Sequence, residues 1–168
     1  MSMHSESARA SSAAEARFRI NDPNSRPRTV KVVALDRPSQ AVVERLAQDQ
    51  WSGANFLVAS ASAAEPQGRR RNWLSDLAGR PKYLLDEING ADLVIMVATA
   101  GENASAAAIV GEACSLQRVM TSALVLGGAS ATDAALSKTL AQLRPWALML
   151  VAASSDDYIA DMLSALRA

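Results

Sequence analysis

The chain has 168 residues, of which 49% are hydrophobic, and its 17 Lys and Arg residues balance its 17 Asp and Glu residues. This length suits one domain with a hydrophobic core, and the balanced charge gives no overall field to attract nucleic acid or an anionic membrane. A single cysteine, Cys114, and a single histidine, His4, exclude an internal disulfide and a zinc site built from Cys and His ligands.

The amino-terminal 28 residues are rich in Ser, Ala and Arg and hold too few large apolar residues for a core. We therefore expect residues 1–28 to form a flexible tail and residues 29–168 to form one domain. No secretion signal is recognisable near the start, and no apolar run reaches the roughly 18 residues of a membrane span. These features predict a cytoplasmic protein that binds neither a membrane nor nucleic acid.

The first half of the predicted domain alternates strands with helices. β-Branched apolar runs predict the strands, and prolines predict the first turn of two helices, where a missing N–H costs no hydrogen bond. Gly90 is expected to end the second of these helices. The elements expected here are a strand at 29–35, a helix at 38–48, a strand at 55–59, a loop at 60–71, a weak helical segment at 72–77 and a helix at 81–88.

The second half continues this alternation. Its first strand is the most hydrophobic run of the chain, so we expect it at the centre of the sheet. Apolar strands separated by amphipathic helices need right-handed crossovers, which predicts a three-layer, doubly wound, Rossmann-like α/β fold with a mainly parallel sheet of about five or six strands. The elements expected here are strands at 92–98, 122–126 and 146–152, helices at 103–117 and 132–143, and a last helix that is capped by Ser154 or Ser155 and carries Ile159, Met162, Leu163 and Leu166 on one face.

Small and polar residues follow the predicted central strand, and two glycines follow the next strand. In doubly wound sheets, ligands bind where the carboxyl ends of strands meet the amino ends of helices. A helix cap explains the polar residues equally well, and a tight turn explains the glycines, so these alternatives stay open. The candidates for the lining of a ligand cleft are Thr99, Gly101, Glu102, Asn103, Ser105, Gly127 and Gly128.

Acid–base chemistry would have to use carboxylates, because the only histidine lies in the predicted tail. Asp36 and Glu102 are the candidate catalytic pair, since each follows a predicted strand at the same edge of the sheet. Capping of the following helix explains Asp36 as well. Cys114 has no histidine or second cysteine to activate it, and we expect it to be a buried structural thiol.

Two segments resemble the nucleotide-binding half of the tubulin/FtsZ family of GTPases. Residues 88–101, Ile-Asn-Gly-Ala-Asp-Leu-Val-Ile-Met-Val-Ala-Thr-Ala-Gly, are similar to the FtsZ segment in which a helix ends at Gly-Ala-Asp and a strand leads through Thr-Ala-Gly into the phosphate loop. Residues 142–151 are similar to the family's Leu-Arg pair and the last strand of its nucleotide domain. The resemblance implies a bacterial-type Rossmann-like domain, with no counterpart of the family's catalytic second half.

The differences from this family predict that the loop no longer binds phosphate. Glu102-Asn103-Ala104-Ser105 stands where the family has glycines and threonines, and the turn after the first strand carries Asp36 and Pro38. A phosphate loop needs converging backbone N–H groups and tolerates no nearby carboxylate. We therefore expect no GTP hydrolysis.

The expected function is binding, either of a small polar ligand at the carboxyl ends of the strands or of a protein partner. That partner could be a second copy of the chain, held by one of the apolar helices. Two alternatives remain open. One is a small transferase or hydrolase that acts on a polar metabolite, and the other is residual binding of a nucleotide, the one cofactor that the sequence suggests, without hydrolysis.

Overall fold

The computed structural model describes residues 26–59 and 74–168, so most of the predicted tail and the predicted loop at 60–71 lie outside the described residues. Within these ranges, seven strands form one sheet in the order β4-β3-β2-β1-β5-β6-β7. The parallel strands are β1 (Val30–Ala34), β2 (Ala54–Ala59), β5 (Leu93–Thr99), β6 (Met120–Leu126) and β7 (Met149–Ala152). Two short antiparallel strands, β3 (Leu74–Asp76) and β4 (Pro81–Lys82), extend the sheet beyond β2.

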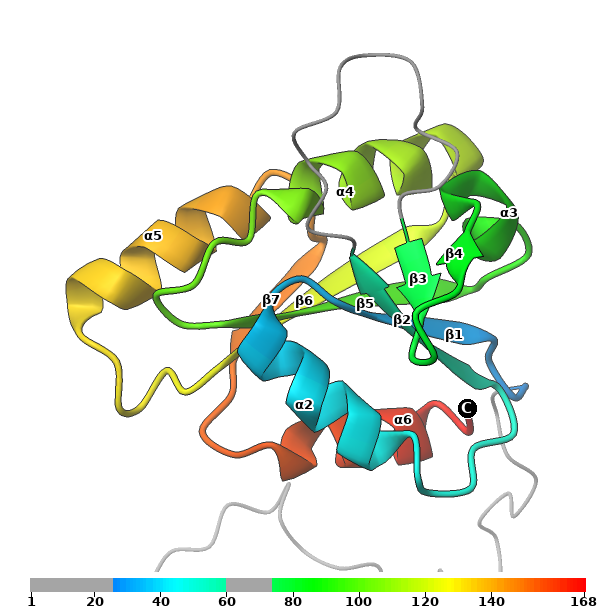
Figure 1. The fold of residues 1–168 in the computed structure, drawn as a ribbon, viewed down its shortest axis with the longest axis horizontal. Coiled ribbons are helices and arrows are strands. Elements are labelled where there is room, and N and C mark those ends of the chain that lie inside the picture. Colours follow the sequence, from blue (N-terminus) through cyan, green and yellow to red (C-terminus); the bar gives the residue numbers. More distant parts are fainter. Residues whose placement is uncertain (1–25, 60–73) are drawn as a thin grey trace, which may run out of the picture.

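Helices cover both faces of this sheet (Figure 1). One face carries α3 (Leu84–Ile88), α4 (Ala106–Gln117) and α5 (Asp133–Leu143), and the other carries α2 (Arg37–Leu46) and α6 (Asp157–Ala165). Each face has its own hydrophobic core, because alternate residues of the central strands point to opposite sides. The three-layer α/β fold predicted from the sequence is therefore confirmed.

The order of the parallel strands fixes where a ligand can enter. The chain moves outward from β1 to β2, and then returns to place β5 on the other side of β1. The segment after β1 leads to α2 on one face, whereas the segment after β5 leads to α4 on the other face. This reversal is a topological switch point, and the diverging segments leave a crevice beyond the carboxyl ends of the two strands.

The β3–β4 hairpin lies where the sequence predicted helical structure, so two helix predictions are wrong in this region. Residues 74–76 of the predicted helical segment form β3, and Pro81 lies in β4 instead of opening a helix, so that α3 begins only at Leu84. The Asp76 carboxylate accepts the backbone N–H groups of Ala78 and Arg80, which closes the turn between the strands. Pro81 is tolerated because β4 is an edge strand, where a missing N–H leaves no ladder bond unmade.

Several other boundaries also differ from prediction, including the start of β6 at residue 120 instead of 122 and the end of α2 at residue 46 instead of 48. The last helix begins at Asp157 with Asp156 at its N-cap, so the expected caps Ser154 and Ser155 lie before the helix. α4 begins at residue 106 instead of 103, because the Asn103 side chain accepts the N–H of Ser105 and forms a turn before the helix. β7 begins at residue 149, after the chain turns where the N–H of Trp146 donates to the carbonyl of Leu143.

Candidate functional site

A crevice of about 650 Å³ lies at the switch point. Its walls come from the end of β1 and the first turn of α2, from the ends of β2 and β3, and from the loop between β5 and α4. Among the described residues, the opposite, amino-terminal end of the sheet contributes none to this lining. The lining residues are Leu35, Asp36, Arg37, Gln40, Val58, Ala59, Ser75, Glu102, Asn103, Ser105 and Ala106.

Asp36 joins the two strands that flank the switch point. Its carboxylate caps α2 by accepting the N–H of Ser39 at 2.8 Å, and the Ser39 hydroxyl completes a capping box. The same carboxylate accepts the backbone N–H of Thr99 at 2.7 Å and the Thr99 hydroxyl at 3.0 Å. The predicted helix cap is confirmed, and the carboxylate occupies the place beside a helix N-terminus where other doubly wound domains bind an anion.

The loop between β5 and α4 has little capacity to hold a phosphate, because most of its backbone donors are already used. The N–H of Ala100 donates to the Leu126 carbonyl, and that of Glu102 donates to the Thr99 carbonyl. Asn103 accepts the N–H of Ser105. A phosphate loop needs such N–H groups free and convergent on the anion.

Helix α5 takes two more of these donors. The Thr139 hydroxyl is fully buried and accepts the N–H of Gly101 at 3.0 Å. The Gln142 side-chain oxygen accepts the N–H of Ala104 at 2.8 Å, while its nitrogen donates to Asn103. We call these two side chains, Thr139 and Gln142, the α5 clamp, because they fasten the loop that forms one wall of the crevice.

The structure brings together in the crevice four of the eight residues that the sequence singles out. Glu102, Asn103 and Ser105 are exposed and line the crevice with the half-buried Asp36. Thr99 does not line the crevice, but its N–H and hydroxyl donate to the Asp36 carboxylate. Gly101 adopts a φ of +90° in the loop.

The two glycines after β6 lie outside the crevice lining. Gly127 has a φ of +71°, and its carbonyl accepts the hydroxyl and the N–H of Ser130. A Cβ on Gly128 would lie 3.3 Å from the Cβ of Ala152. The tight-turn alternative therefore accounts for both glycines through backbone conformation and close packing.

Three polar residues of the lining were not predicted from the sequence. Arg37 and Gln40 lie three positions apart in the first turns of α2, and that spacing places them on one helix face beside Asp36. This signal was available in the sequence. The position of Ser75 in the lining could not be predicted in this way, because β3 is too short to show a strand pattern and its residues were expected to be helical.

Among the described residues, neither Cys114 nor a metal site adds chemistry to the crevice. Burial raises the pKa of the Cys114 thiol to about 12, so the thiol stays protonated and unreactive, as expected for a structural cysteine. Among the described residues, no group of three or more His, Cys, Asp or Glu side chains could hold a metal ion. In the same part of the chain, no helix is long and apolar enough to cross a membrane.

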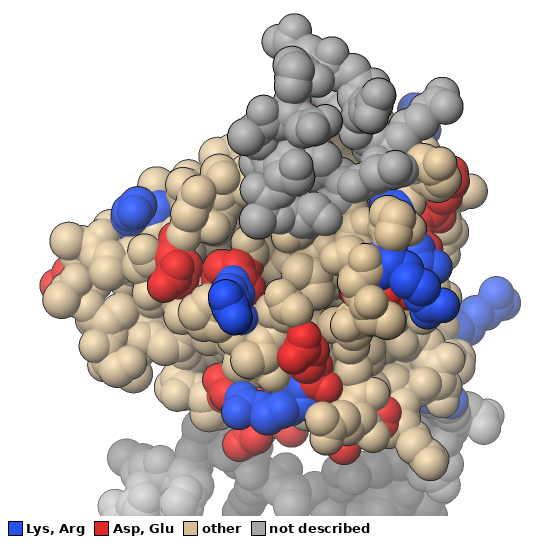
Figure 2. Space-filling view, in the orientation of Figure 1, with Lys and Arg blue, Asp and Glu red and all other residues tan. Residues whose placement is uncertain are grey.

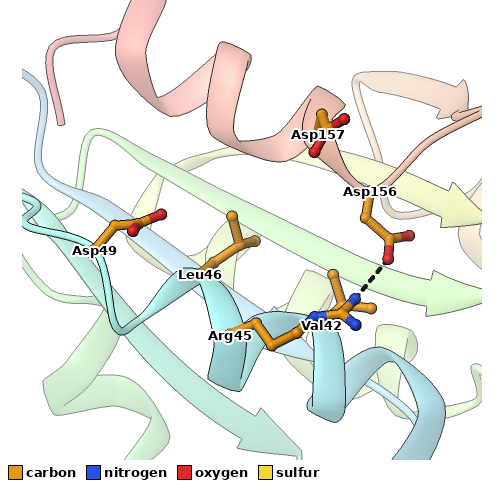
Figure 3. Close-up of a pocket in the computed structure, with 6 residues that line it drawn as sticks. All are labelled: Val42, Arg45, Leu46, Asp49, Asp156 and Asp157. Atoms are coloured by element: carbon orange, nitrogen blue, oxygen red, sulfur yellow. Dashed lines mark hydrogen bonds and ion pairs between the residues drawn. The ribbon is translucent and has the colours of Figure 1, made fainter.

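A smaller hollow of about 360 Å³ lies between α2 and the start of α6 (Figure 3). Arg45 of α2 reaches across it to Asp156, with 2.6 Å between the guanidinium and the carboxylate. Both side chains are about half exposed or more, and an ion pair in water contributes at most about 1 kcal/mol. We assign this hollow to the packing of the two helices.

The visible surface shows no large patch of charged side chains of a single sign. In Figure 2, basic and acidic side chains lie beside one another on the visible side of the molecule, with uncharged surface between them. This distribution matches the overall balance of charge and offers no basic stripe of the kind that binds nucleic acid.

Comparison with known proteins finds no family model that matches the chain and no significant match among curated proteins. Its function must therefore be inferred from its site.

Proposed function

We propose that this chain is a binding domain whose crevice at the switch point takes a small polar ligand that carries no phosphate. The observation that carries the proposal is the crevice of about 650 Å³ at the edge of the sheet where doubly wound folds bind ligands. A volume of this size falls within the range of small-molecule sites.

The charges of the lining support a ligand without phosphate. Asp36 and Glu102 are the acids of the lining and Arg37 is its one cation, so the described lining carries a formal net charge of −1. A polyphosphate would face two carboxylates and would find the nearby N–H groups of Ser39, Thr99 and Gly101 already bonded. A neutral or cationic ligand with hydrogen-bond donors suits Glu102 and the neighbouring amide and hydroxyl groups better.

The hydrogen bonds of Asp36 favour binding over catalysis. A general base must reach the proton that it removes. Both oxygens of the Asp36 carboxylate already accept bonds, from Ser39 and Thr99, so this residue is held as a structural anion. The alternative of an enzyme with an Asp36–Glu102 pair therefore has less support than binding. The resemblance to the tubulin/FtsZ family stays a prediction, and the present proposal stands without it.

Thermal unfolding of the full chain with a panel of compounds tests the proposal. We expect at least one of guanosine, adenosine, arginine and spermidine to raise Tm, and citrate and GTP with Mg²⁺ to leave Tm unchanged. A ligand at ten times its Kd adds about 1.4 kcal/mol of stability, which raises the Tm of a domain of this size by a few degrees.

A bulky substitution separates binding in the crevice from binding elsewhere. Ser105→Trp fills the crevice at a residue whose side chain makes no cap bond, and it should abolish the rise in Tm. Ser164→Trp, on the exposed face of α6, is the matched control and should preserve it. A panel without any response, stabilisation by GTP, or a response that survives in Ser105→Trp would each overturn the proposal.

A further inference from the structure

The two edges of the sheet are protected to different degrees. At one edge, β4 is only two residues long and consists of Pro81 and Lys82. Short edge strands, prolines and lysines are the devices by which proteins prevent strands of other molecules from pairing with a sheet. At the other edge, β7 reads Met149-Leu150-Val151-Ala152 and has none of these devices.

The outer side of β7 pairs with no strand among the described residues, because β6 is its one neighbour there. The chain from Trp146 to Ser155 contains no charged residue. Alternate backbone N–H and C=O groups of an edge strand point away from its neighbour, and another extended chain can pair with the whole row of such groups. This edge therefore offers a surface to which a further β-strand can be added.

Exposed apolar side chains surround the start of the same strand. Leu148 is 79% exposed and Met149 is 42% exposed at the start of β7, and Met120 is 50% exposed at the start of the adjacent β6. Leu116, near the end of α4, is 71% exposed. A contact that extends the sheet would bring these side chains toward the partner and remove apolar surface from water.

A second copy of the chain meets the geometric requirements of this edge. Leu150 packs toward the core beneath α4 and α5, and Val151 packs toward the core beneath α6. In an antiparallel pair, opposite residues share one face of the sheet, so a two-fold axis perpendicular to the sheet must pass through a residue position. With Leu150 on the axis, Met149 faces Val151 of the other copy, and identical uncharged strands meet without repulsion.

We infer that two copies of this chain pair their β7 strands antiparallel about a two-fold axis and join their sheets into one continuous sheet. The partner surface lies on a strand edge, whereas the sequence led us to expect it on a helix. The crevice lies at the switch point between β1 and β5, so dimerisation leaves it open in both copies.

Sedimentation velocity of the full chain over a wide range of concentration tests this inference. We expect a monomer–dimer equilibrium, which Met149→Lys and Met149→Glu should each weaken about tenfold or more, because each charge then faces the apolar Val151 of the other copy and the two like charges lie diagonally across the axis on one face. The sharper test is the mixture of the two variants, in which the charges diagonally across the axis are opposite and heterodimers should form. Leu85→Lys, at a side chain that is 44% exposed on α3, is the matched control and should dimerise like the wild type.

Four outcomes would overturn the inference. A wild-type chain that stays monomeric at every concentration excludes the dimer. Dimers that persist in both Met149 variants, or that dissociate in Leu85→Lys, place the contact elsewhere. A mixture of folded Met149→Lys and Met149→Glu chains that yields no heterodimer shows that position 149 does not lie diagonally across the axis from its copy. Circular dichroism of each variant establishes that it is folded.

Discussion

The Asp36 carboxylate links positions that are 63 residues apart in the sequence, the cap of α2 and the end of β5. Its three donors come from Ser39 and from the backbone and side chain of Thr99. A negative charge that belongs to the chain itself therefore stands beside a helix N-terminus, where it also interacts favourably with the helix dipole. This single residue both stabilises the switch point and disfavours anionic ligands there.

Replacing Asp36 tests both roles. Asp36→Ala should lower the free energy of unfolding by about 2–3 kcal/mol, because it removes a helix cap and leaves the half-buried N–H of Thr99 without its acceptor. The same variant should gain stability from added sulfate, which can enter the vacated anion position, whereas the wild type should gain less. Urea unfolding with and without sulfate at constant ionic strength measures both effects.

Asp157→Ala is the control for this experiment, since Asp157 is an exposed acid in the first turn of α6. It should cost less than about 1 kcal/mol, the usual contribution of an exposed charge at a helix end. Equal losses in the two variants would show that the Thr99 contact contributes nothing beyond an ordinary surface charge.

At the scale of elements, α5 determines the shape of the crevice wall without lining the crevice. The α5 clamp holds the loop between β5 and α4 through Gly101 and Ala104, at positions where a glycine-rich loop would be free to bind phosphate. Thr139 and Gln142 lie three positions apart, so one face of the helix presents both side chains to the loop. The loop is thus preorganised by a neighbouring helix instead of by a ligand.

Removing one hydroxyl of the α5 clamp should loosen this wall. Thr139→Val keeps the shape of the side chain but leaves the N–H of Gly101 without its acceptor, which should cost about 1–3 kcal/mol. Hydrogen exchange should accelerate at residues 101–105 more than in the sheet. Ser137→Ala, at an exposed position of the same helix, should change neither property. Unchanged exchange in Thr139→Val would show that the clamp does not order the loop.

The elements differ in how well the sequence could predict them, and the reasons are physical. β1 and β5 are buried, β-branched runs, and their predicted bounds agree with the structure to within one residue at each end. β3 and β4 are too short to show a strand period, and Pro81 fits an edge strand as well as a helix start. The cap formed by Asp36 is local and was predictable, whereas its bond to Thr99 depends on the order of the strands.

For the molecule as a whole, the two ends of the sheet differ in structure. The carboxyl ends open into the crevice, while polar and backbone contacts close the amino ends. Asp92 accepts the N–H of Thr29, and Lys31 and Lys82 both pair with Glu87. Strand order decides which loops meet at each end, and no periodicity in the sequence specifies that order. The location of the crevice could therefore be anticipated only as an edge of the sheet, and its lining could be anticipated only in part.

Gly53 joins three segments of the chain at the closed end. Its carbonyl accepts the N–H of Val30, and the neighbouring Arg28 donates its N–H to the carbonyl of Leu166 near the end of the chain. A Cβ at position 53 would clash with the Arg28 carbonyl oxygen and would lie 3.4 Å from the Cα of Ala168. The obstacle is backbone on both sides, so a substitution cannot be absorbed by the rotation of a side chain.

We expect Gly53→Ala to lower the free energy of unfolding by about 1–3 kcal/mol, the usual cost of overpacking, even though alanine restricts the unfolded chain and so favours folding. Urea unfolding measures the loss, and Ser52→Ala at the exposed neighbouring position should change stability little. Because the strain lies at the amino end of the sheet, the response of Tm to a ligand in the crevice should persist in Gly53→Ala. A variant as stable as the wild type would mean that the three segments are not held together at Gly53. A loss of ligand response would mean that the two ends of the sheet are coupled.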